Sequence, residues 1–122
     1  MKKNVLLTIV FAVLVFCSPA FAHPPSDITI TYDVKSKMLK ALITHNVNNT
    51  AKHYISKVDV GLNGREIISQ QISRQDDFLN QTVSYYIPDT KPGDILSVEA
   101  YCSISGKLQK EFKVPGQKQE PL

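Results

Sequence analysis

Apolar and polar residues alternate along most of the chain after residue 22. This pattern is typical of β-strands that bury one face, because successive side chains of a strand point to opposite sides. No stretch in this part of the chain has a convincing helical pattern. The alternation predicts seven short strands, at residues 28–32, 39–43, 54–62, 67–73, 79–87, 96–102 and 108–114.

The connections between these stretches carry turn residues. Asn63-Gly64 is a strong hairpin signal, because both residues tolerate the positive φ of a type I′ turn. Residues 88–94 have turn chemistry, and Gly106 is expected to form a bend. Short strands at near-regular spacing predict an all-β domain at residues 23–114, a seven-stranded antiparallel immunoglobulin-like β-sandwich. Residues 115–122 are expected to form a flexible tail.

The first 22 residues have the organisation of a secretory signal peptide. Lys2 and Lys3 precede an apolar run at residues 5–16, and a small-residue segment ends at Ala22, where we expect cleavage. The apolar run is shorter than the roughly 20 residues that span a bilayer, so no stable membrane anchor is expected. The predicted location is the bacterial periplasm, or outside the cell.

Removal of this leader changes the charge and cysteine count. Two of the 14 basic residues lie in the leader, and the chain has 11 acidic residues, so the remaining domain is nearly neutral. Near neutrality gives no electrostatic reason to expect a nucleic acid or an anionic membrane as partner. Cys102 is then the only cysteine, and the oligomeric state is left open.

Cys102 and the three histidines are the candidates for chemistry. Cys102 is predicted to share the buried face of its strand, where it can be a small hydrophobic residue or a metal ligand. His23 precedes the first strand, His45 ends the second, and His53 opens the third. Each histidine taken alone is as readily an exposed residue at a loop edge. Imidazole and thiolate together suit iron, copper or zinc better than magnesium or calcium.

The segments "HYI" at residues 53–55 and "AYCSISG" at residues 100–106 resemble motifs of the desulfoferrodoxins and superoxide reductases. The likeness runs from His23 to about Phe112 and covers the iron domain of that family, a seven-stranded immunoglobulin-like sandwich. The resemblance implies a non-haem iron site that reduces superoxide, or another small redox ligand, with electrons from a donor that the sequence does not identify. It implies His23, His45 and His53 as equatorial ligands and Cys102 as the axial thiolate.

The chain departs from the family pattern at Ser105, where the family has its fourth histidine ligand. A free α-amine at His23 is one hypothetical replacement, and it would favour copper as the alternative metal. Two other interpretations remain. The domain is a non-catalytic module that holds copper, iron or zinc, or it is a metal-free β-sandwich that binds a protein or peptide.

Overall fold

The computed structural model describes residues 23–116, and within them the fold is all-β without a helix. All seven predicted strands are present, with ends that differ from the prediction by a few residues. The strands are β1 (Asp27–Asp33), β2 (Met38–Thr44), β3 (Ile55–Leu62), β4 (Arg65–Gln71), β5 (Asn80–Tyr86), β6 (Ile95–Cys102) and β7 (Lys107–Lys113).

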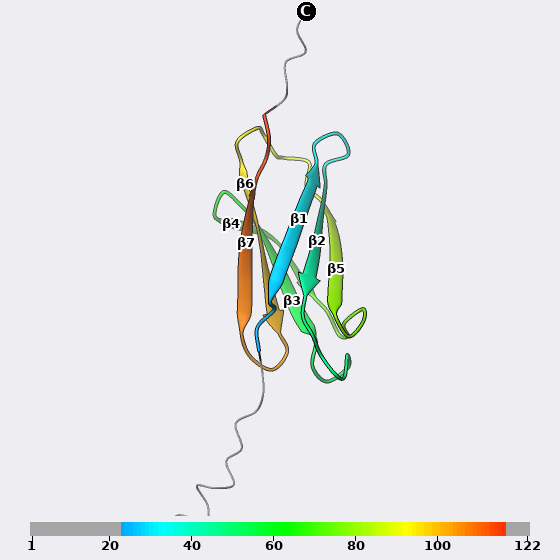
Figure 1. Ribbon diagram of the computed structural model, residues 1–122. Coiled ribbons are helices and arrows are strands. Elements are labelled where there is room, and N and C mark those ends of the chain that lie inside the picture. The colour runs from blue at the N-terminus through cyan, green and yellow to red at the C-terminus, as the bar shows by residue number, and fades with distance from the viewer. Residues whose placement is uncertain (1–22, 117–122) are drawn as a thin grey trace, which may run out of the picture.

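The strands form two sheets, and every strand pair is antiparallel. One sheet has the order β1-β2-β5 and the other has the order β4-β3-β6-β7. Figure 1 shows them as two layers, with the long axes of the strands running in roughly the same direction. The all-β class and the antiparallel arrangement are therefore confirmed.

The core lies between the sheets and consists of the inward-facing residues of both. Strand β6 shows the predicted alternation most clearly, since every second residue from Leu96 to Cys102 is buried. The two edge strands of the four-stranded sheet have no fully buried residue: only Ile68 of β4 and Leu108 and Phe112 of β7 are half-buried. The buried hydrophobic cluster consists of Ile28, Tyr32, Leu39, Ala41, Ile43, Ile55, Val58, Val60, Val83, Ile87, Leu96, Val98, Ala100 and Val114.

Two predicted turns have the backbone conformation that their residues favour. Asn63 and Gly64 connect β3 to β4 with φ values of 51° and 83°, both in the left-handed region that a type I′ turn requires. Gly106 precedes β7 with a φ of 90°. Local sequence alone therefore specified these two reversals of the chain.

The candidate metal ligands predicted from the sequence lie next to strand ends at one end of the fold. Strands β1 and β3 begin at this end and strands β2 and β6 finish there, at the lower side of Figure 1. The register pairs Asp27 with Thr44 and Ile55 with Cys102. Segments that flank these positions are therefore neighbours, although they are far apart in the sequence.

Some expectations fall on residues outside the described range. The signal peptide of residues 1–22 and all but the first two residues of the expected tail at 115–122 belong to this group. Within residues 23–116, no helix is long and apolar enough to cross a membrane.

The turn between β6 and β7 supports the segment that carries His23. A Cβ atom added to Gly106 would lie 3.0 Å from the backbone nitrogen of Pro24, whereas one added to Gly93, which has a similar φ of 89°, would meet nothing within 4 Å. Gly93 is therefore a matched control for backbone strain.

We predict that Gly106→Ala and Gly93→Ala both destabilise the fold by about 1 kcal/mol or more, because alanine is strained at positive φ. Gly106→Ala should cost more, since its methyl group also pushes Pro24 away. Chemical denaturation of both variants measures the difference. Equal losses would show that Pro24 does not press on the turn.

Candidate metal centre

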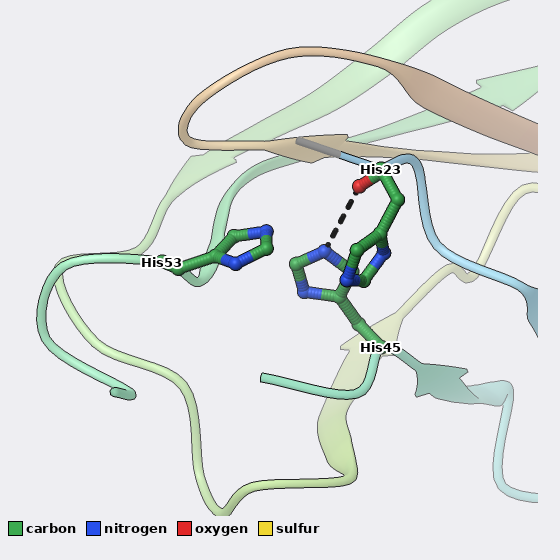
Figure 2. Close-up of side chains that lie close together, drawn as sticks. All are labelled: His23, His45 and His53. Atoms are coloured by element: carbon green, nitrogen blue, oxygen red, sulfur yellow. Dashed lines mark hydrogen bonds between the residues drawn. The ribbon is translucent and has the colours of Figure 1, made fainter. Parts of the chain in front are cut away.

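Three histidines from three separate segments converge at this end of the fold. Ligand atoms of His23, His45 and His53 all lie within 4.8 Å of one another. Their ring centroids are 4.8 Å apart for His23 and His45, 4.9 Å for His23 and His53, and 4.8 Å for His45 and His53. Figure 2 shows the three rings gathered around a common space.

Backbone contacts hold these segments in place. The amide of His45 donates to the carbonyl of Leu79 at 2.8 Å, which extends the pairing of β2 and β5 by one residue. The amide of His53 donates to the carbonyl of Asn49 at 2.9 Å. The side chain of Asn49 accepts from the amide of Ala51 at 3.0 Å and so closes a local turn. The polar loop at residues 46–52 thus folds back and delivers His53 beside His45.

The hydrogen bonds of the rings indicate which nitrogens face the common space. Nδ1 of His45 contacts Oε1 of Gln75 at 2.8 Å, and Nδ1 of His23 lies 3.1 Å from the carbonyl oxygen of Pro24. Nε2 of His45 lies 3.2 Å from the carbonyl oxygen of His23, as the dashed line in Figure 2 marks. Both nitrogens of His45 therefore have a contact within the protein, whereas on the His23 ring only Nδ1 has one and Nε2 is left as the candidate ligand atom.

His53 has a buried ring nitrogen without a hydrogen-bond partner. Its Nε2 is buried and has no hydrogen-bond partner, and no other buried side-chain nitrogen or oxygen of residues 23–116 shares this condition. Leaving such an atom unpaired costs about 1–3 kcal/mol, so its presence calls for an explanation. A metal ion bound to this nitrogen provides one.

The surroundings of His53 favour its neutral imidazole, the form that binds metals. Burial lowers the pKa of His53 below its ordinary value, and the positive charges of protonated His45 and His23 lower it further. The group contains no carboxylate to stabilise the protonated rings. The ring of His53 is therefore better suited to bind a metal cation than a proton.

The cluster opens to solvent on one side. An open cavity of about 320 Å³ is lined by His23, Asn46, Val47, Asn48 and His53. His45 lies at the opposite extreme, with 0% of its surface exposed. A metal held by three imidazoles at this place would keep a coordination position accessible from the cavity, as catalytic and exchange sites do.

Cys102 is near this end of the fold, but its sulfur does not belong to the group of converging ligand atoms. Its side chain is buried on the inward side of β6, opposite Ile55, and the thiol is free. Ser105 is exposed in the turn before β7. The structure thus brings together three of the four predicted ligands. Ligation by Cys102 stays a prediction.

Gln75 is a site residue that the sequence analysis missed. It is 1% exposed, and its side chain contacts the ring of His45 and the backbone of His45, Ile55 and Asp77. It lies in the loop before β5, where a glutamine between Arg74 and Asp76 has no local pattern that distinguishes it from a solvated residue. Only the folded arrangement reveals its contacts.

Three imidazoles close together can bind a transition-metal ion, and imidazole nitrogen suits zinc, copper, iron and nickel. The geometry does not select one of these metals. Comparison with known proteins adds no constraint, since no family model, curated protein or solved structure matches the chain.

We predict that His53→Leu weakens metal binding by more than the roughly 10–100-fold that the loss of an outer-shell partner costs. The metal-free protein should keep its stability or gain some, because the buried unpaired nitrogen is removed. Isothermal titration with Zn²⁺ and thermal unfolding measure the two effects.

Lys52→Ala is the matched control, because Lys52 is an exposed neighbour in the same loop and contributes no ligand. Its zinc affinity should equal that of the unmodified protein. If His53→Leu binds zinc equally well, His53 is not a ligand.

Proposed function

We propose that this protein binds one transition-metal ion through His23, His45 and His53, on an immunoglobulin-like β-sandwich of the superoxide-reductase type. The observation that carries the proposal is the buried, unpartnered Nε2 of His53 inside a group of three converging histidines. A buried polar atom without a partner is rare in native proteins. Three segments from different parts of the chain meet here.

The strand order supports the immunoglobulin-like part of the proposal. With strands lettered along the chain as A, B, C, C′, E, F and G, the two sheets read A-B-E and C′-C-F-G. In immunoglobulin-like domains, strands A, B and E likewise share one sheet, and C, F and G share the other. The fourth strand of this protein pairs with the third, in the position that C′ has in variable-type domains.

The ligand set favours a metal-holding role over turnover. Three neutral imidazoles suit iron, copper and zinc, of which iron is the metal that the family resemblance implies and copper is the alternative. Ser105 stands where the fourth histidine of the family would be, and it is exposed and uncharged. We therefore propose storage, delivery or sensing of a metal ion in the periplasm or outside the cell.

Superoxide reduction is the second candidate function, and the position of Cys102 favours it. The thiol is buried at the end of β6, and its residue pairs with Ile55, two positions after His53. An iron ion at the centre would supply one electron, which together with two protons converts superoxide to hydrogen peroxide. An external electron donor would have to restore the ferrous state.

We predict that the purified protein binds one Fe²⁺, Cu²⁺ or Zn²⁺ ion per chain. Elemental analysis of protein isolated from its native compartment identifies the metal, and anaerobic titration gives the stoichiometry. The His53→Leu variant shows how much metal binds elsewhere. Failure of all three ions to bind the unmodified protein would leave a metal-free interaction domain as the better interpretation.

Cys102→Ser separates the two candidate functions. A thiolate ligand gives oxidised iron a sulfur-to-iron charge-transfer band, and its donation tunes the metal. If Cys102 is the axial ligand, the variant loses this band and the reduction of superoxide while it keeps an ion on the histidines. If the protein only holds metal, spectrum and affinity should be unchanged, since the sulfur lies outside the cluster.

A further inference from the structure

We propose that Gln75 is the positioning residue of this centre. It fixes His45 in the tautomer that carries the proton on Nδ1, so that Nε2 directs its lone pair at the metal ion. The part of this inference that concerns the ion rests on the proposed function. The part that concerns the tautomer does not, because it follows from hydrogen bonds within the protein.

The orientation of the Gln75 amide follows from its backbone partners. Its Nε2 donates to the carbonyl oxygen of His45 at 2.7 Å and to that of Asp77 at 2.9 Å. Its Oε1 accepts from the amide of Ile55 at 3.2 Å. A flipped amide would put oxygen against two carbonyl groups and nitrogen against an N–H group. The oxygen of Gln75 therefore faces the ring of His45.

The protonation pattern of His45 follows from that orientation. Nδ1 of His45 lies 2.8 Å from Oε1 of Gln75, which is an acceptor only, so Nδ1 must donate. A neutral imidazole has one N–H group, and its Nε2 then carries a lone pair. Both side chains are almost completely buried, at 0% exposure for His45 and 1% for Gln75, so solvent does not compete for this bond.

The surroundings of His45 Nε2 suit a cation. The atom lies 3.2 Å from the carbonyl oxygen of His23, which also offers lone pairs. Two acceptors at this distance repel each other. A positive charge beside both, such as a bound metal ion, makes the arrangement favourable. Metal-bound histidines commonly donate their second N–H to a carbonyl or carboxylate oxygen, and Gln75 provides an amide oxygen for this purpose.

Gln81 offers a matched comparison in the same region. It is buried like Gln75, and it anchors the same loop through two hydrogen bonds with Asp76, at 3.1 and 3.2 Å. Its amide also donates to the carbonyl of Thr82 at 2.9 Å. None of its hydrogen bonds involves a histidine. Removal of Gln81 therefore disturbs the loop without changing the acceptor of His45.

The first test uses the unmodified, metal-free protein at about pH 8, where an ordinary imidazole is neutral. Nitrogen-15 chemical shifts of the histidine rings distinguish the two tautomers, and the His23→Ala and His53→Leu variants assign the signals. We expect His45 to carry its proton on Nδ1. A proton on Nε2 would overturn the inference, whatever the protein does with metals.

The second test compares three variants by titration with Zn²⁺ and Co²⁺. Gln75→Leu removes the acceptor and should lower affinity by roughly 10–100-fold, with His45 shifting towards the Nε2–H tautomer. Gln75→Glu keeps an acceptor oxygen and should retain the Nδ1–H tautomer and affinity within a few-fold, although it loses two donors and some stability. Gln81→Leu should lose stability but keep both tautomer and affinity.

The outcomes separate this inference from the proposed function. Equal losses of affinity in Gln75→Leu and Gln81→Leu would show that Gln75 acts only as a loop anchor, which overturns the positioning role. Unchanged affinity in Gln75→Leu would do the same. If the unmodified protein binds neither Zn²⁺ nor Co²⁺, the proposed function fails and the positioning role fails with it, even with His45 in the Nδ1–H form.

Discussion

The buried side chain of Gln75 joins the two sheets by hydrogen bonds at the end of the fold where the three histidines converge. Gln75 precedes β5, His45 follows β2, and the same amide group also holds Ile55 at the start of β3. A single side chain thus connects the three-stranded sheet to the four-stranded sheet. Because the side chain is almost completely buried, water cannot replace a lost hydrogen bond, and leaving any one of these bonds unmade would destabilise the fold.

His53 differs from Gln75, because one of its buried polar atoms has no hydrogen-bond partner. Its Nε2 is buried without a partner, and burial together with its histidine neighbours lowers the pKa of the ring. Functional sites commonly keep features that destabilise the protein without its ligand, because the bound ligand provides the interaction that is otherwise absent. A metal ion would give His53 Nε2 its partner and relieve the contact between His45 Nε2 and the carbonyl of His23. The unpartnered Nε2 of His53 is the observation that supports the proposal, and the contact at His45 Nε2 adds to it through the tautomer inferred from Gln75.

The two candidate functions differ in whether the thiol of Cys102 is a metal ligand. Its side chain is buried at the end of β6, where a cysteine is stable as a small hydrophobic residue. The proximity of the β6 end to His53 in the strand register leaves the thiol at the correct end of the fold for ligation. The three histidines form a group without it, so the proposed metal site does not require the thiol.

The strands and their turns could be predicted from the sequence, whereas the site required the tertiary structure. Alternation in β6 and the Asn63-Gly64 turn are local properties, since side-chain direction and permitted φ depend on adjacent residues. Leu79 was predicted to belong to a strand, yet it is 56% exposed and precedes β5, because period-2 patterns do not locate strand ends. The sequence determined which residue types were present for metal binding. The tertiary structure decided that three of these residues, His23, His45 and His53, meet. It did so through the register of strands that are distant in the sequence and through a buried glutamine that no local pattern reveals.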